Sequence, residues 1–502
     1  MKKMMVAVAA AFCVKLSFAA LRLGAPFADG AVLQRQMPVP VWGWDEPGAK
    51  VTVSFAGQEK SAVADSSGKW MVRLDPMEAS NESRDLTVSA AASAIEQSEQ
   101  PNNRTILHDI LVGEVWYASG QSNMELPLCG GNPRFRDRQG ALVAQALNYD
   151  DIRFCYASDY KASEFPKATN SYPIAWKRVK HPNANTFSAL ATYYAIEIHN
   201  AIHVPVGIVG SYSGGTKIQP WTPAEGVATY PDYAWKPYDP SNTTWTTSSA
   251  SVFWNEMVEC WTPMAMRGFI WYQGCSNSGE WKVYDKLMLA LYKGWSKKFE
   301  NPDLKLYFVQ LAPYGSEGYT KIREAQAKFA AEEPNAAMAV IADIGNIHDI
   351  HPNEKELVAK RLALHALRRD YGFAHVRDNS PTLREWKIEG RKFVLDFNDA
   401  KNFYVYYPDI YSPDGNCTNL FEVCGINGVW RPARILNPQT LYKNASGEKS
   451  NGLIREIAPG RLEVAADDVE EPKKLRFLYR KPWFGALYNE VNLPVGPFHI
   501  GD

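Results

Sequence analysis

The pair best suited to acid–base chemistry is Asp349 and His351. Pro352 follows directly, and a proline forces the residue before it into an extended conformation. In an extended segment, residues two apart project to the same side, so a carboxylate and an imidazole can meet there. An aspartate that fixes the tautomer of a histidine leaves Nε2 of the ring free to act as a general base. Asp343 and His348 lie nearby and are alternative candidates for the two roles.

A predicted helix begins at Pro352, because proline suits the first helical turn. The non-catalytic alternative is that Asp349 caps this helix and His351 is solvated. The motif is nevertheless the most specific in the chain, because the proline, the helix and the spacing of the pair all indicate one geometry.

A nucleophile for such a base is present at Ser122, in the stretch SGQSNM that follows the apolar run 110–117. At a strand-to-helix turn, the N–H of a serine can face a developing oxyanion and the helix dipole favours negative charge. The second glycine of G-x-S-x-G is absent, so this is not the nucleophile elbow of the α/β hydrolases. The alternative is that Ser122 is only a helix N-cap. We expect Ser119 to be part of the turn that presents Ser122.

Two further polar clusters follow strand-like runs and could stabilise an oxyanion. Gly214 and Gly215 come after VGIVG, and paired glycines let a backbone N–H approach a ligand closely. Asn277 comes after GFIWYQG, and an asparagine side-chain N–H can be an oxyanion donor. Taken singly, each cluster is better explained as an ordinary turn.

The elements that must position these residues form an alternating pattern in the middle of the chain. Strand-like runs lie at 110–119, 204–215, 266–274, 304–313 and 336–345, with helix-like runs at 192–202 and 321–333. The alternation predicts a parallel sheet with helices on both faces. Functional groups of such a sheet gather at the carboxyl ends of its strands.

The whole chain divides into four predicted parts. Residues 1–20 resemble a secretory signal peptide, with a basic start, a short apolar stretch and small residues at the end. Residues 21–105 read as a small β domain, 106–371 as the α/β catalytic domain, and 372–502 as a second β-rich region. We therefore expect an exported protein, periplasmic or secreted.

Charge and hydropathy exclude several kinds of partner. Lys and Arg number 54 against 55 Asp and Glu, so nothing favours nucleic acid or an anionic membrane as a partner. After the leader, no stretch reaches the roughly 18 apolar residues of a spanning helix. Aromatic residues make up 12 % of the chain, which suits β-rich cores as well as sugar-stacking surfaces.

The cysteines give no sign of a zinc site, because no Cys/His spacing of that kind is present. Cys13 is lost with the leader. Six cysteines remain, an even number that permits up to three disulfides in an oxidising compartment: Cys129, Cys155, Cys260, Cys275, Cys417 and Cys424.

Together these segments resemble the sialate O-acetylesterase family, within the SGNH (GDSL-like) hydrolases. The resemblance is carried by GEVWYASGQSNM, GSYSGGTKIQPW, GFIWYQGCSN, FVQLAPY followed by REAQ, and HDIHPNEKELVAKRLAL. Flanking stretches match as well: LQRQMPVPVWGWDEPGAKVTV near the start and LYNEVNLPVGPF near the end. The resemblance implies a three-layer α/β/α catalytic domain between β-rich, sandwich-like regions.

The resemblance also implies roles for individual residues. Ser122 would be the nucleophile, His351 the general base and Asp349 the residue that orients the histidine. The N–H groups of Ser122 and of one glycine in the pair Gly214–Gly215, with the Asn277 side chain, would form the oxyanion hole. Substrate-binding positions would be Gln121, Gln219, Trp221 and Gln273. No metal or cofactor is implied.

Two positions depart from the family pattern. Cys275 and Gln219 stand where the family usually has glutamate, and both changes remove a negative charge beside the expected pocket. They leave the hydrolytic residues intact and affect the choice of sugar.

The implied function is an exported carbohydrate O-acetylesterase acting on O-acetylated sialic acids of glycans. The alternatives are an acetyl-xylan or other polysaccharide acetylesterase and, in another class, a non-catalytic carbohydrate-binding protein.

Cys275 suggests one further expectation. A glutamate there could anchor the Asn277 loop through charge-assisted hydrogen bonds, and a cysteine cannot. A disulfide between Cys129 and Cys275 would hold this loop against the segment of Ser122. The alternative is that Cys275 is a free, buried thiol packed against apolar neighbours.

Overall fold

The computed structural model describes most of the chain between residues 21 and 501. The described ranges are 21–91, 103–131, 136–157, 162–169, 174–239, 241, 247–315, 317–345, 348–406, 421–436, 438–440, 454–457, 460–479 and 487–501. The predicted signal peptide and Cys417 lie outside these residues. Export therefore stays a prediction.

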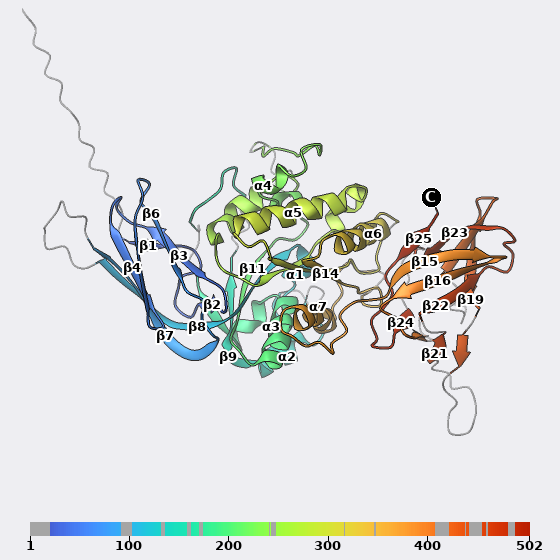
Figure 1. The fold of residues 1–502 in the computed structure, drawn as a ribbon, viewed down its shortest axis with the longest axis horizontal. Helices are drawn as coiled ribbons and strands as arrows, with labels where there is room; N and C mark the ends of the chain where they lie inside the picture. Colours follow the sequence, from blue (N-terminus) through green and yellow to red (C-terminus); the bar gives the residue numbers. More distant parts are fainter. Residues whose placement is uncertain are drawn as a thin grey trace, which may run out of the picture.

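A largely parallel sheet forms the centre of the molecule (Figure 1). Its strands follow the order β10 (Trp176–Lys180), β9 (Asn148–Tyr156), β11 (Val206–Tyr212), β8 (Asn103–Gly120), β12 (Gly268–Tyr272), β13 (Lys305–Val309) and β14 (Ala336–Ala339). All neighbours in this order are parallel except β10 and β9. Strands β11 and β12 are buried along their whole length, as expected for a sheet covered on both faces.

Helices cover both faces of this sheet (Figure 1). One face carries α2 (Gly140–Ala146), α3 (Ala189–Ile202) and α7 (Lys355–Arg369), and α3 packs against α7. The other face carries α4 (Ala224–Val227), α5 (Tyr284–Lys298) and α6 (Glu317–Glu332). Short helical turns complete the domain: α1 (Ser122–Glu125), η2 (Asn183–Thr186), η3 (Gln219–Trp221), η5 (Trp254–Val258), η6 (Glu259–Trp261) and η7 (Cys275–Glu280).

The N-terminal β region is joined to the central sheet by one long strand. β8 has 18 residues; its first half pairs with β7 (Ser80–Ala91) and its second half with β11 and β12. The region also contains β2 (Val32–Gln34), β4 (Lys50–Phe55) and β5 (Gln58–Val63), and a separate sheet of β1 (Arg22–Leu23), β3 (Val39–Trp44) and β6 (Lys69–Leu74). The boundary drawn from the sequence between 105 and 106 therefore falls inside a shared strand.

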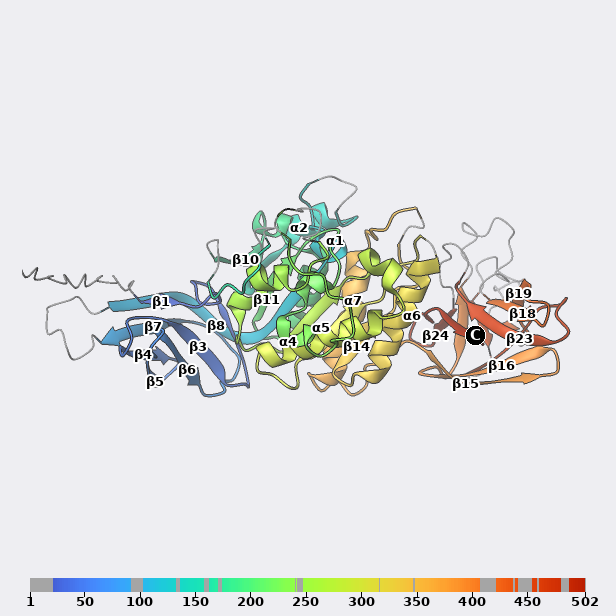
Figure 2. The same cartoon turned by 90° about the horizontal axis from the view of Figure 1, so that it is seen from above.

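The C-terminal region consists of two antiparallel sheets and follows the central domain in a row (Figure 2). The larger sheet has the order β15 (Thr382–Glu389), β16 (Lys392–Asn398), β22 (Arg461–Ala465), β19 (Trp430–Ile435), β18 (Phe421–Gly425), β23 (Pro472–Phe477) and β25 (Phe498–Ile500). The smaller has the order β20 (Pro438–Thr440), β21 (Ile454–Ile457), β17 (Phe403–Tyr406) and β24 (Leu487–Asn489). Their apolar residues form a second core, which Val340 and Ala342 of the central domain join.

The predicted mixed α/β class is confirmed. Each of the five strand-like runs of the middle domain contains a strand. The run 192–202 lies within α3, and the run 321–333 lies within α6 except for its last residue. The predicted start of the last helix is wrong: α7 begins at Lys355, with Glu354 at the N-cap, and not at Pro352. The three residues before it belong to the loop that carries His351.

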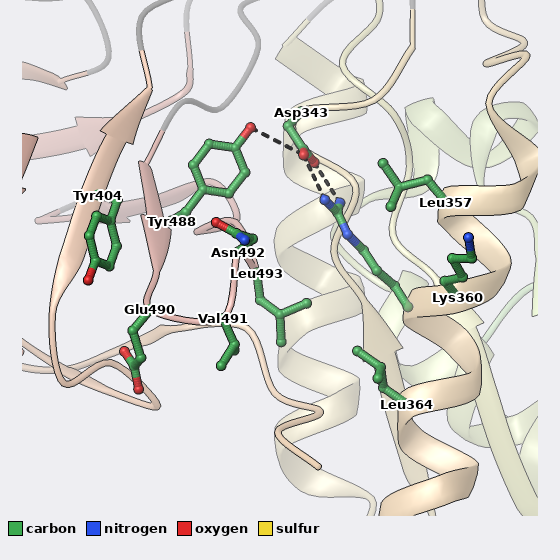
Figure 3. A pocket seen from close by; sticks show the side chains of 11 residues that line it. Asp343, Leu357, Lys360, Leu364, Tyr404, Tyr488, Glu490, Val491, Asn492 and Leu493 are labelled. Carbon is green, nitrogen blue, oxygen red and sulfur yellow. Dashed lines mark hydrogen bonds and ion pairs between the residues drawn. The ribbon is translucent and has the colours of Figure 1, made fainter. Parts of the chain in front are cut away.

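A pocket of about 520 Å³ lies between α7 and the C-terminal strands (Figure 3). Tyr404 and Tyr488 are cross-strand neighbours on β17 and β24 and form one wall. On the other wall, Asp343 accepts two hydrogen bonds from Arg361, at 2.6 and 2.7 Å, and one from the Tyr488 hydroxyl at 3.2 Å. Asp343 therefore joins the central and C-terminal parts.

Glu114 plays a similar part at the N-terminal junction. Its carboxylate lies in β8, is 0 % exposed and accepts hydrogen bonds from Gln34, Arg35 and Arg267. Gln34 and Arg35 belong to the N-terminal region, whereas Arg267 precedes β12. One buried carboxylate therefore neutralises an arginine from each side of the junction.

We expect Glu114→Ala to destabilise the protein by about 3 kcal/mol, because it leaves two arginines without a counter-charge. The side chains of Arg35 and Arg267 are 16 % and 21 % exposed. The loss of stability should therefore lie at the low end of the range for a broken buried ion pair. The measurement is the urea midpoint of unfolding. Glu82→Ala removes an exposed partner of Arg84 and is the control, with an effect below about 1 kcal/mol. A Glu114→Ala midpoint equal to that of this control would contradict the account.

Candidate active site

Ser122 stands where β8 ends in a sharp turn. Gly120 has a φ of 140°, which L side chains rarely adopt, and a Cβ there would lie 2.3 Å from the Tyr272 carbonyl oxygen. The N–H of Gln121 donates to the same carbonyl at 3.0 Å. Ser122 opens the four-residue α1 and is partly exposed. The turn therefore presents its hydroxyl at the carboxyl edge of the parallel strands.

Ser119 lies in the strand and not in the turn. It is 0 % exposed, and its neighbours on the adjacent strands are Ser211 and Trp271. The predicted place of Ser119 in the turn is therefore wrong, and its buried hydroxyl has no access to a substrate.

The structure brings His351 to Ser122. Its Nε2 lies 2.9 Å from Ser122 Oγ, within hydrogen-bond distance, although the two residues are 229 positions apart. The loop after β14 carries the histidine across the carboxyl edge of the sheet. Of the two rivals named from the sequence, Asp343 is bound to Arg361 and His348 is an exposed residue of the same loop.

Asp349 lies beside His351, but mainly through the backbone. Its Oδ1 accepts the His351 backbone N–H at 2.9 Å and lies 3.4 Å from Nδ1 of the ring. The second distance is longer than a strong hydrogen bond. The carboxylate therefore fixes the turn that carries the imidazole and holds a negative charge near it.

The environment favours the neutral form of the imidazole. Burial lowers the pKa of His351 below its ordinary value of 6.5, and the charge of Lys355 acts in the same direction, against the opposing effect of Asp349. A neutral Nε2 directed at a serine hydroxyl can accept its proton.

The two glycines of the second cluster have different places. A Cβ on Gly214 would lie 3.5 Å from Ser122 Cβ and 3.2 Å from a Glu125 carboxylate oxygen, so Gly214 is packed against the nucleophile. Gly215 has a φ of 72° and open space around it, which indicates a turn residue. Within the described part of the chain, no hydrogen bond is recorded from the N–H groups of Ser122 and Gly214.

Asn277 lies deeper than expected. Its side chain is 0 % exposed, and its amide hydrogens are donated to Gln219 Oε1 at 3.1 Å and Glu280 Oε2 at 2.7 Å. Its oxygen accepts from Gln273 Nε2 at 2.8 Å and from the Ile218 N–H. An oxyanion role for Asn277 stays a prediction and requires one of these bonds to open.

The predicted substrate-binding residues also lie behind the site surface. Trp221 and Gln273 are 0 % exposed and Gln219 is 2 % exposed, and each donates a hydrogen bond inside the protein. They support the loops and offer almost no surface, and their substrate-binding role stays a prediction. Gln121 is 3 % exposed, and its Oε1 accepts the N–H groups of Gly274 and Cys275.

Sequence reasoning missed Glu280, at the end of η7. Its carboxylate accepts hydrogen bonds from Tyr233 at 2.6 Å, Lys217 at 2.9 Å and Asn277. Burial alone would raise the pKa of Glu280, but the bonds from Tyr233 and Lys217 lower it overall. A negative charge is therefore present in this cluster although residues 219 and 275 carry none. Its nearness to Cys275 in the sequence was the only available signal.

The expected disulfide is wrong. Cys129 and Cys275 are both free thiols, as are Cys155, Cys260 and Cys424. The Cys275 loop is held instead by Gln121, through the two backbone N–H groups that its side-chain oxygen accepts. Burial raises the pKa of the Cys275 thiol to about 12, so the thiol is neutral.

Among the described residues, no group of three or more His, Cys, Asp or Glu side chains could hold a metal ion. The same part of the chain contains no helix with the length and apolar character needed to cross a membrane.

A partly exposed serine hydroxyl against a histidine Nε2, at the carboxyl edge of a parallel sheet, is the arrangement of an ester hydrolase. Residues 112–367, just over half of the chain, match the family model described as "Carbohydrate esterase, sialic acid-specific acetylesterase". The chain belongs to this family, and it is an ester hydrolase.

Similarity extends beyond the matched segment. The chain is 27 % identical over 452 residues to the human sialate O-acetylesterase, covering 82 % of each chain. It is 25 % identical over 486 residues to the rat enzyme of the same name, covering 84 % of this chain and 86 % of that one. A crystal structure of a carbohydrate acetylesterase from Xanthomonas citri superposes with a TM-score of 0.79 at 29 % identity, covering 96 % of this chain and 99 % of that one.

The free state of Cys275 can be tested by alkylation without reductant. We expect iodoacetamide to leave Cys275 unmodified in the folded protein, because the thiol is buried and its pKa is about 12. After unfolding in urea, still without reductant, mass spectrometry should find Cys275 alkylated. Cys129 is partly exposed and should react earlier. If Cys275 were alkylated only after reduction, it would be part of a disulfide, and the free state described here would be contradicted.

Proposed function

We propose that this protein is a carbohydrate O-acetylesterase that uses Ser122 as nucleophile and His351 as general base, with O-acetylated sialic acids as its substrates. The observation that carries the proposal is the 2.9 Å contact between Ser122 Oγ and His351 Nε2. The neutral imidazole and the partly exposed hydroxyl suit the two partners to these roles.

Acylation begins with attack of Ser122 Oγ on the acetyl carbonyl carbon, while His351 Nε2 takes the hydroxyl proton. The tetrahedral intermediate collapses when the bond between the carbonyl carbon and the sugar oxygen breaks. His351 returns the proton to that oxygen, so the sugar leaves as an alcohol and Ser122 carries the acetyl group.

Deacylation repeats the sequence with water. His351 takes a proton from the water molecule, whose oxygen attacks the acetyl-serine carbonyl. The second tetrahedral intermediate releases acetate, and the proton returns to Ser122 Oγ.

The oxyanion of both intermediates needs hydrogen-bond donors directed at the former carbonyl oxygen. We assign this role to the backbone N–H groups of Ser122 and Gly214, two residues that are packed against each other. Asn277 would supply a third donor if its bond to Gln219 opened when the substrate binds.

Asp349 acts on the base. Its hydrogen bond from the His351 backbone fixes the loop, and its charge favours the imidazolium that forms transiently. Because Asp349 Oδ1 lies 3.4 Å from His351 Nδ1, it fixes the tautomer of the imidazole less firmly than a tightly hydrogen-bonded aspartate would.

The choice of sialic acid over other acetylated sugars is supported by the curated relatives, which are named sialate O-acetylesterases. The principal rival is a polysaccharide such as acetyl-xylan, because Gln219 and Cys275 depart from the family pattern. Glu280 returns a carboxylate to that cluster, which favours the family's substrate. A three-layer SGNH arrangement of the catalytic domain and export from the cell are parts of the same proposal.

We expect Ser122→Ala to lower kcat for acetate release by several orders of magnitude, whereas Ser119→Ala, at a buried strand position, should be mild. Acetate is measured from O-acetylated sialic acids, acetyl-xylan and 4-nitrophenyl acetate. Faster release from acetyl-xylan would select the polysaccharide, and binding of sugars without release would indicate a non-catalytic protein. Equal losses in the two variants would reject Ser122 as nucleophile.

The lowered pKa of His351 predicts a pH profile. The base must be unprotonated, so kcat/KM should fall as the pH drops through this pKa, with a midpoint below 6.5. The profile is measured with 4-nitrophenyl acetate after confirming that the protein stays folded at each pH. A midpoint above 6.5 would contradict the described surroundings of His351.

A further inference from the structure

Lys355 is a buried cation next to the proposed catalytic pair. It is the first residue of α7, four positions after His351, and its side chain is 0 % exposed. Its Nζ donates to Asn123 Oδ1 at 2.7 Å and lies 5.1 Å from the centroid of the Tyr272 ring. No ion pair between Nζ and a carboxylate is recorded among the described residues.

Such a position is unfavourable for an ammonium group. A buried charge without a paired counter-charge loses its hydration, and a neutral amide and an aromatic face compensate only in part. Burial accordingly lowers the pKa of Lys355 to about 7. A side chain kept there against this cost is a candidate for a role in the site.

The amide of Asn123 connects this lysine to the catalytic pair. Its Oδ1 faces Lys355, so its Nδ2 points the other way and donates to the Ile350 carbonyl at 3.0 Å. Asn123 follows Ser122 directly, and Ile350 precedes His351. The Asn123 side chain therefore holds the Ser122 segment and the His351 loop together. Because the Lys355 ammonium group can only donate, it sets the orientation of the Asn123 amide.

Ionisable groups from several elements lie around Lys355 and His351. Asp137, before α2, accepts the Lys355 backbone N–H at 3.1 Å. Glu354 and Asp349 lie on the His351 loop, and their carboxylates, with that of Asp137, favour the charged lysine. Cys275 lies on η7 and faces the lysine as a neutral thiol. His351 itself is faced by Lys355, Asp349 and the Ser122 hydroxyl.

We propose that Lys355 is a positioning residue for the esterase reaction: it orients Asn123 so that the His351 loop is held against Ser122, and its buried charge opposes protonation of the imidazole. The inference rests on the proposed roles of Ser122 and His351. It adds a residue that touches neither the substrate nor the reacting atoms.

Two consequences follow for catalysis. With a pKa of about 7, Lys355 carries its charge at the lower pH at which His351 takes up a proton. The imidazole therefore stays available as a base in more acidic solution. A less basic imidazole is also a stronger acid when protonated, which suits the return of the proton to the leaving sugar oxygen.

The test separates charge from orientation in the full-length protein. Lys355→Gln removes the charge and keeps a donor for Asn123, and Lys355→Met removes both. Lys360→Met, at an exposed position of the same helix, is the control. The readouts are kcat and the acid midpoint of kcat/KM with 4-nitrophenyl acetate.

We expect both Lys355 variants to move the acid midpoint upward by roughly half to one pH unit. Lys355→Met and Asn123→Ala should also lose about 10- to 100-fold in kcat, because the reacting groups are misplaced. Lys360→Met should change neither quantity. A uniform loss of activity with an unmoved midpoint in both Lys355 variants would reduce Lys355 to a structural residue and overturn the proposal.

An NMR titration of the His351 ring, assigned by its absence in His351→Ala, gives a second readout that does not need activity. The ring should titrate at higher pH in Lys355→Gln than in the parent protein, and equal values would overturn the charge effect. If Lys355→Met does not fold, the Gln variant and Asn123→Ala decide. An active Ser122→Ala would instead refute the proposed function, while the ring titration would still test Lys355.

Discussion

The site depends on one side-chain amide, that of Asn123. Ser122 and His351 are brought by elements far apart in the sequence, and a contact of 2.9 Å between them tolerates little movement. Asn123 connects their segments by donating to the Ile350 carbonyl, and Lys355 determines its orientation from within the core. The turn that carries Ser122 and Asn123 follows directly after β8. This strand is shared by the N-terminal region and the central sheet.

The sequence predicted the parts of the site that follow from strand ends. Ser122, Gly214 and His351 each come soon after an apolar run, and parallel strands in one sheet place such residues at a common edge. The proline after His351 further restricted the backbone at that position. For these residues, the strand ends indicated a common edge, and the family resemblance supplied the individual roles.

Other features depended on side-chain packing that no local pattern encodes. Asn277 also follows a strand, yet a buried network with Glu280 occupies its amide hydrogens. Cys275 was expected to need a disulfide, because no local pattern indicates that the Gln121 side chain holds its loop. The extent of β8 was missed for a different reason: a break in character near residue 105 looks like a domain boundary, although the backbone continues as one strand.

The proposed mechanism requires Ser122 as the nucleophile, and a fluorophosphonate that reacts with activated serines tests this most directly. Peptide mapping after stoichiometric inactivation should find the label on Ser122, and His351→Ala should label far more slowly because its base is missing. Label on another serine would contradict the account. So would full inactivation of the esterase with Ser122 unmodified.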